Sequence, residues 1–305
     1  MPRFLVTGAA RLMSDIISSL EREWKMDNLA EKVWFVTGTS AGLGRALAER
    51  IVERGGRVVA TARNKADVND LAALDEARVA TAELDVADPR KVDAAVALAE
   101  QRFGRIDTLV NCAGYALLSA MEEASDNEIQ AQFEVNFFGA IRVMRAALPL
   151  MRRQKSGLII NYSSLAGARS FPGSSLYCAT KWALEGLSEG LAQEIRSFGI
   201  GVLIVQPGPF RTDFSGRSIG NPASPIAAYS DAAEKRLRSR SNHGRQMGDP
   251  RRAADLVIDA ALDPNRPLRL LLGSTTLDQA QEALRERLAD MERSRTVAPG
   301  ADFPS

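Results

Sequence analysis

The segment Val33-Trp-Phe-Val-Thr-Gly-Thr-Ser-Ala-Gly-Leu-Gly44 decides the fold, because a short apolar run leads directly into a glycine-rich turn. Val33–Thr37 predicts a buried strand, and Gly42–Arg54 has the spacing of a helix. Glycines at 38, 42 and 44 permit a tight turn and the close approach of a ligand to the backbone. A helix N-terminus offers free N–H groups and a positive dipole end, so this turn suits a pyrophosphate.

The rest of the chain repeats this alternation of short apolar runs with helical periodicity. Such an alternation predicts a parallel sheet that is covered by helices on both faces. We expect a single α/β domain, doubly wound around seven strands at Val33–Thr37, Arg57–Ala62, Val79–Leu84, Ile106–Val110, Leu158–Tyr162, Ile200–Val205 and Leu268–Leu272.

Local signals predict several helix starts. Ser125-Asp-Asn-Glu128 is a capping box that opens a long helix toward Met151. Thr276-Leu-Asp-Gln279 has the same pattern and predicts a second capped start. Asp249-Pro250 is an N-cap followed by proline at the first helical position.

Two stretches depart from the regular pattern. We expect residues 1–30 to form an extension, in part an amphipathic helix, and residues 31–305 to form the domain. Residues 207–242 are rich in proline, glycine and serine. A long irregular loop in a compact domain is usually functional, so this stretch is expected to be a substrate lid.

Composition excludes several classes of protein. The chain has 305 residues and a net charge of +1, which implies no nucleic-acid or membrane partner. No run approaches the ~20 apolar residues of a membrane helix. Two cysteines in separate segments fit a reduced, cytoplasmic setting. The single histidine, His243, excludes a histidine-rich metal site.

Tyr177 and Lys181 stand at i and i+4, so they share one face of a helix. An ammonium beside a phenol favours the phenolate, and we expect the pKa of Tyr177 to fall from about 10 toward neutrality. Tyr177 is then a candidate acid or base, and Ser164 would hold the oxygen that exchanges the proton. Taken alone, the spacing also fits an exposed helical pair.

The glycine turn has a rival interpretation. Gly38-Thr-Ser40-Ala-Gly42 is a literal G-x-S-x-G, the nucleophile elbow of serine hydrolases. His243 and many aspartates follow it in the required order. An elbow normally follows several strands, however, and His243 lies in a polar stretch. A plain structural turn is the third interpretation.

Taken together, the motifs resemble those of the short-chain dehydrogenase/reductase family, in its Tyr-x3-Lys branch. The resemblance covers about residues 30–273, and Cys112 departs from it where the family usually has a second asparagine. Its motifs occur here in order as the glycine turn, Asn111-Cys-Ala-Gly114, Asn136, Ser164, Tyr177-x3-Lys181 and Pro207-Gly208 with Thr212. The resemblance implies a Rossmann fold and an NAD(P)-dependent oxidoreductase acting on CH–OH groups, similar to the 17β-hydroxysteroid-dehydrogenase-like subgroup.

The resemblance also implies residue roles. Tyr177 would be the catalytic acid or base, and Lys181 would lower its pKa and hold the nicotinamide ribose. Ser164 would bond the substrate oxygen, and Asn136 would keep a water in a proton relay. Taken alone, Asn136 fits better as a helix residue bonded to a neighbouring strand, and Asp85 fits a strand-end cap equally well. The cofactor would contact Gly38, Ser40, Gly42, Leu43, Gly44, Arg63, Asp85, Val86, Asn111, Ala113, Gly114, Tyr177, Lys181, Pro207, Gly208 and Thr212.

Arg63 follows the second expected strand, where the residue type indicates which nicotinamide cofactor is preferred. NAD sites of this kind often place an acidic residue here for the ribose 2′-OH, whereas an arginine accommodates a 2′-phosphate. The planar guanidinium pairs well with phosphate, so we expect NADP(H) to be preferred over NAD(H). A solvated surface arginine is the alternative.

Substrate and assembly follow from the resemblance. The substrate region would contain Tyr115, Leu117, Leu118, Phe171, Phe210 and Phe214, which predicts a hydrophobic ketone, aldehyde or secondary alcohol. The helices that carry Asn136 and Tyr177 would form the interface of a homodimer or homotetramer. A non-catalytic NADP-binding regulatory protein on the same fold is the alternative function, although all four catalytic residues are present.

Overall fold

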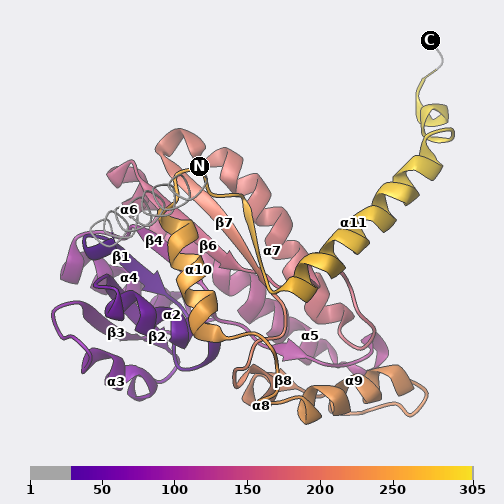
Figure 1. Ribbon diagram of the computed structural model, residues 1–305, viewed down its shortest axis with the longest axis horizontal. Helices are drawn as coiled ribbons and strands as arrows, with labels where there is room; N and C mark the ends of the chain where they lie inside the picture. Colours follow the sequence, from indigo (N-terminus) through magenta and orange to yellow (C-terminus); the bar gives the residue numbers. More distant parts are fainter. Residues whose placement is uncertain (1–28, 304–305) are drawn as a thin grey trace, which may run out of the picture.

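The computed structural model describes residues 29–303, with a seven-stranded parallel sheet at its centre (Figure 1). The strand order is β3-β2-β1-β4-β6-β7-β9. The fold class is confirmed, and each expected strand is present with ends shifted by at most two residues. The strands are β1 Val33–Val36, β2 Arg57–Ala62, β3 Val79–Glu83, β4 Thr108–Asn111, β6 Gly157–Tyr162, β7 Ile200–Pro207 and β9 Arg269–Leu272.

The order of the strands reverses at β1, which pairs with β2 on one side and β4 on the other. Ligands of open α/β sheets bind at such a switch point, beyond the carboxyl ends of the strands. Thr37 fixes this point, because its hydroxyl accepts the N–H groups of Cys112 and Ala113 at 3.0 and 3.1 Å. The turns that follow β1 and β4 are thereby held together.

Helices cover both faces of the sheet. One core is formed against α2 (Gly42–Glu53) and α10 (Pro250–Leu262). The other is formed against α4 (Pro89–Phe103), α6 (Gly139–Gln154) and α7 (Ser175–Glu194). Leu29, expected in the N-terminal extension, is fully buried in the first core. The amphipathic helix expected before it lies outside the described residues.

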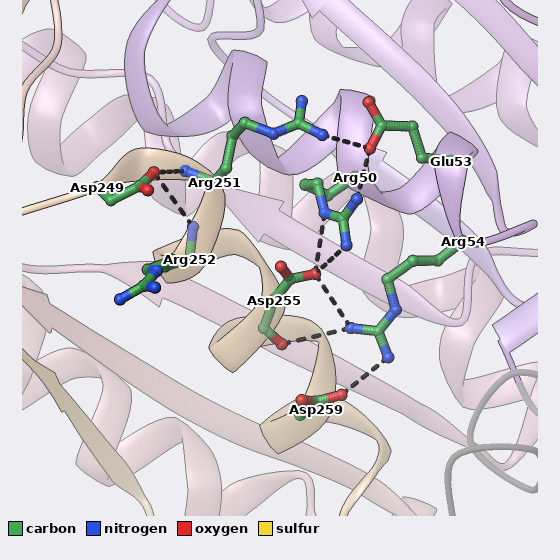
Figure 2. A network of polar contacts seen from close by, with 8 residues as sticks. All are labelled: Arg50, Glu53, Arg54, Asp249, Arg251, Arg252, Asp255 and Asp259. Atoms are coloured by element: carbon green, nitrogen blue, oxygen red, sulfur yellow. Dashed lines mark hydrogen bonds and ion pairs between the residues drawn. The ribbon is translucent and has the colours of Figure 1, made fainter. Parts of the chain in front are cut away.

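An ionic network joins α2 to α10 (Figure 2). Arg50 donates to Asp255 at 2.9 and 2.7 Å, and Arg54 donates to Asp259 at 2.8 Å. Asp249 accepts the N–H of Arg251 at 2.8 Å, which confirms the predicted cap of α10. The helix that follows the glycine turn is thus held at its far end.

Of the two other predicted helix starts, one is confirmed and one is wrong. The capping box of Ser125 and Glu128 is confirmed, and it opens α5 (Asp126–Phe133). A π-helical turn, Glu134–Phe138, joins α5 to α6. The predicted cap at Thr276 is wrong, because α11 (Ser274–Ser294) begins after Gly273 and Thr276 is fully buried within its first turn.

The expected lid is more regular than its composition predicts. It contains α8 (Phe214–Arg217), β8 (Ile219–Gly220) and the twelve-residue helix α9 (Ser230–Ser241). β8 pairs with β5 (Ala116–Leu117), and these elements lie together at one end of the molecule (Figure 1). The expectation of a wholly irregular loop is therefore corrected. Within residues 29–303, no helix has both the length and the apolar character needed to cross a membrane.

Candidate active site

A cavity of about 950 Å³ extends from the glycine turn after β1 to the lid. Every site residue expected from the sequence lines it, except Asn111 and Asn136. The lining includes Gly38, Ser40, Gly42, Leu43, Gly44, Arg63, Asp85, Val86, Ala113, Gly114, Ser164, Tyr177, Lys181, Pro207, Gly208 and Thr212. The fold thus brings together motifs that lie far apart in the sequence.

The glycine turn leaves no room for side chains at Gly38 and Gly44. Gly38 has φ +74°, and a Cβ added to it would lie 2.9 Å from the Cα of Ala113. A Cβ on Gly44 would lie 2.5 Å from the carbonyl oxygen of Gly38. The N-cap of α2, Ala41, makes no side-chain hydrogen bond, and no acidic residue stands in the first turn. The helix N-terminus therefore offers its N–H groups to an anion, and the turn fits a dinucleotide pyrophosphate.

Thr39 ties this turn to the second strand. Its amide and its hydroxyl both donate to the carbonyl of Thr61, at 2.9 and 3.0 Å. This contact places Arg63, two residues further on, at the exposed rim of the cavity together with Asp67. Among the residues that the structure describes, Arg63 pairs with no carboxylate. Its guanidinium is accordingly available to a ligand.

Ser164, Tyr177 and Lys181 meet in the middle of the cavity. Ser164 follows β6 and caps the short helix Leu165–Gly167, where it accepts the N–H of Ala166 at 3.1 Å. Its hydroxyl also hydrogen-bonds to Tyr177, in the first turn of α7. The Nζ of Lys181 donates to the carbonyl of Tyr162 at 2.8 Å and lies 5.8 Å from the centroid of the Tyr177 ring. These contacts fix all three groups relative to one another.

Burial controls the ionisation of this cluster. It raises the pKa of Tyr177 to about 12, although the hydrogen bond from Ser164 acts in the opposite direction. Burial also lowers the pKa of Lys181 to about 8. The expectation that the pKa of Tyr177 falls toward neutrality is therefore wrong for the protein without cofactor. The phenol loses its solvation, and the ammonium is bonded to a backbone carbonyl rather than to the phenol oxygen.

Asn136 and Asn111 lie behind the cavity wall. Asn136, in the π-helical turn, donates to the carbonyl of Tyr115 at 2.8 Å and accepts its N–H at 3.0 Å. This agrees with the interpretation of Asn136 as a residue bonded to a neighbouring segment. Asn111 donates to the side chain of Asn161 at 2.8 Å. Asp85 lines the cavity and also caps a turn, by accepting the N–H of Ala87 at 3.0 Å.

The end of the cavity beneath the lid is mainly aromatic. Leu117 was expected to line this end, but it is buried outside the cavity lining. Successive side chains of a strand alternate between two faces, so Leu117 of β5 points away from the face of its neighbours. The centroid of the Phe214 ring lies 6.4 Å from that of Tyr177, so the lid reaches the reactive cluster. Other apolar side chains that line this end are Tyr115, Leu118, Phe171 and Phe210.

The sequence interpretation missed the polar groups of α9. Lys235 and Ser239, four residues apart, both line the cavity, as does Gln246 beyond the helix. The i, i+4 spacing is the signal that identifies such a face once a helix is assumed. His243 lies against Gly216 of α8 and does not line the cavity that Ser40 lines. The geometry therefore gives no support to a serine hydrolase.

Comparisons with known proteins agree with the geometry. The model of the family described as short chain dehydrogenase matches residues 32–221. Oxidoreductase BOA17 of Botryotinia fuckeliana is 39% identical over 270 residues, with 88% of this chain and 98% of that protein covered. The crystal structure of a short-chain dehydrogenase from Streptomyces avermitilis is 41% identical, with a TM-score of 0.83 over 89% of this chain and 98% of that one.

Two further solved structures were determined with a nicotinamide cofactor. A short chain dehydrogenase/reductase from Burkholderia phymatum, in complex with NAD, is 26% identical with a TM-score of 0.75, covering 90% of this chain and 98% of that chain. A short chain dehydrogenase from Burkholderia cenocepacia, in complex with NADP, is 28% identical with a TM-score of 0.67, covering 86% and 96%. The chain described here belongs to the short-chain dehydrogenase/reductase family of oxidoreductases.

Proposed function

We propose that the protein transfers hydride between NADP(H) and the carbonyl or secondary alcohol of a hydrophobic small molecule. The observation that carries this proposal is the single cavity that joins the uncapped glycine turn to Ser164, Tyr177 and Lys181. One end fits a dinucleotide, and the other end offers a proton donor within an apolar enclosure. Reduction of a carbonyl needs both.

The roles of the side chains follow from their protonation and contacts. When bound, the nicotinamide ring supplies or accepts the hydride. Tyr177 keeps its proton at neutral pH because its pKa is raised to about 12, so it can donate to a carbonyl oxygen. Ser164, already bonded to the phenol, would hold that same oxygen. The Lys181 ammonium would stabilise the phenolate left after proton donation.

Asn136 has a positioning role in this proposal. Its amide group satisfies both backbone groups of Tyr115 and also donates to the hydroxyl of Thr180 at 3.2 Å. It thereby holds the segment after β4 against α7, one residue before Lys181. A water relay to solvent would pass beside this contact, and we retain it as part of the proposal.

Arg63 supports the preference for NADP(H). A hydrogen bond to a charged group contributes about 1.5–3 kcal/mol, or roughly ten- to a hundred-fold in affinity. We expect Arg63→Met to lower kcat/KM for NADPH by that factor and to change kcat/KM for NADH little. Arg90→Met, on α4 with a side chain that is 92% exposed, is the matched control. Equal losses with both cofactors would contradict the assignment.

We also propose a hydrophobic substrate, a homo-oligomer and a cytoplasmic location. The aromatic lining beneath the lid supports a hydrophobic substrate. Exposed apolar side chains on the π-helical turn and α7, Phe138 and Trp182, support a homodimer or homotetramer through these helices. The free thiols of Cys112 and Cys178 support a cytoplasmic location.

A panel of ketones and aldehydes, read by the absorbance of NADPH, tests the proposal. We expect the hydrophobic carbonyl compounds to be reduced, and small charged ones to be reduced poorly unless they also carry a large apolar group. Tight NADPH binding without turnover of any carbonyl or alcohol would overturn the proposal and favour a regulatory nucleotide-binding protein.

A further inference from the structure

Lys235 lies on the lid helix α9, and its charge is directed at the mainly aromatic end of the cavity. It stands on α9, and its Nζ donates to the hydroxyl of Ser174 at 2.7 Å. The same ammonium lies 4.9 Å from the centroid of the Phe171 ring. All three residues line the cavity. A lysine in this position is unexpected if the pocket takes only uncharged molecules.

The positive charge of Lys235 has no anionic partner among the described residues. Asp231, one turn earlier on α9, makes no ion pair with it, and Glu234 pairs with Arg238 instead. Burial lowers the pKa of Lys235, as expected when desolvation is not compensated by a carboxylate. Lys235 is partly buried, and a charge that is withdrawn from water is normally paired, so a carboxylate of the ligand would supply the missing anion.

The helix that carries Lys235 is firmly attached. The neighbouring residue, Arg236, donates to both carboxylate oxygens of Glu123 at 2.7 and 3.2 Å, and the Glu123 side chain is fully buried. This ion pair fixes the position of α9, and the hydrogen bond to Ser174 directs the Lys235 ammonium into the cavity. Ser174 is the N-cap of α7 and precedes Tyr177 by three residues, so the ammonium that it binds lies near the same end of α7 as the reacting phenol.

We propose that Lys235 is a specificity-determining residue that binds a carboxylate of the substrate, while the aromatic wall holds the apolar body. The proposal rests on the proposed function and narrows its substrate class to oxo acids, or hydroxy acids, with a hydrophobic group. The carbonyl would lie at Tyr177 and Ser164, and the carboxylate at Lys235, with Ser239 as a further hydrogen-bond donor. Phe171 packs beside both the ammonium and the ligand.

A matched pair of substrates separates charge recognition from general activity. Benzoylpropionate and its methyl ester share the ketone and the ring but differ in charge. We expect the wild type to prefer the acid by about ten-fold or more in kcat/KM, the effect of one charged hydrogen bond. Lys235→Met should abolish this preference and leave the ester little changed, and Lys235→Arg should retain most of it. Arg238→Met, on the outer side of the same helix, should leave the preference intact.

A binding measurement decides the question without turnover. Phenylbutyrate and phenylbutyramide contain no ketone, and calorimetry on the intact protein gives their affinities directly. We expect the carboxylate to bind the wild type at least about ten-fold more tightly than the amide, and this difference to vanish in Lys235→Met. Equal affinities in the wild type, or equal losses for both ligands in the variant, would overturn the proposal and leave Lys235 as a lid contact. Absence of all turnover with the charge preference intact in calorimetry would instead contradict the proposed function alone.

Discussion

The pKa values of Tyr177 and Lys181 lie further apart in the folded protein than those of the free side chains. The phenol rises to about 12 and the ammonium falls to about 8, both because burial penalises the charged form. At neutral pH the pair consists of a neutral phenol and a cation. This is the state that a carbonyl reduction requires at its start, because the proton to be donated is already in place.

A titration of the cofactor-free protein tests this ionisation. Because its pKa is raised, Tyr177 should keep its proton until the pH approaches about 12. The ultraviolet difference between wild type and Tyr177→Phe should therefore show no tyrosinate from Tyr177 at neutral or mildly alkaline pH. The other three tyrosines, whose pKa values are also raised, are present in both proteins, so their absorbance cancels in the difference spectrum. A tyrosinate signal that titrates near neutrality would contradict the burial effect.

At the scale of elements, α9 is positioned by a buried ion pair rather than by an apolar face. Glu123 accepts from Arg236, from the amide of Ala120 at 2.7 Å and from the amide of Ile226 at 3.0 Å. These bonds hold the pKa of Glu123 down at about 2. The carboxylate thus connects the segment after β5, the lid loop and α9 in one place.

Breaking this ion pair should loosen the lid. Arg236→Met leaves a buried carboxylate with its two amide donors but without its cation, and the loss of one partner of a buried ion pair typically costs about 3–5 kcal/mol. We expect faster hydrogen exchange in peptides that cover 230–241, partial recovery in the double variant with Glu123→Gln, and no change in Arg238→Met. Unchanged exchange in Arg236→Met would show that α9 is held by other contacts.

The pH dependence of this attachment follows from the lowered pKa of Glu123. A carboxylate whose pKa is lowered by folding stabilises the protein fully above its pKa in the unfolded chain, which is about 4.3. This stabilisation is lost as the pH falls toward the folded-state pKa of about 2. The difference in free energy of unfolding between wild type and Glu123→Gln should accordingly shrink as the pH falls through this window. A difference that is constant down to the lowest pH would contradict it.

The whole fold was predictable because its strands are continuous apolar runs. Val33–Val36 and the other core strands are buried on both faces, and that pattern needs no knowledge of the partner elements. The glycine turn was predictable for a similar local reason. The fold class is therefore a consequence of short-range sequence signals and their order, whereas the grouping of Ser164 with Tyr177 and Lys181 was expected from the family resemblance.

Features that could not be predicted from the sequence depend on contacts between residues far apart in the chain. α9 is strongly polar and is attached through Arg236 to Glu123, 113 residues away, so no local apolar stripe marks it. The direction of the pKa shift at Tyr177 depends on burial, which spacing alone does not reveal. The contacts of Asn136 could not be predicted for the same reason, because the π-helical turn is needed to bring its side chain to the backbone of Tyr115.

The most direct test of the account is Tyr177→Phe, measured for both binding and chemistry. NADPH affinity, followed by cofactor fluorescence, should stay close to that of the wild type, because the ring remains and only the hydroxyl is lost. Single-turnover oxidation of NADPH by a hydrophobic ketone should slow by about 10²–10⁴-fold, the usual contribution of a general acid. A variant that oxidises NADPH at the wild-type rate would contradict the central claim that Tyr177 delivers the proton.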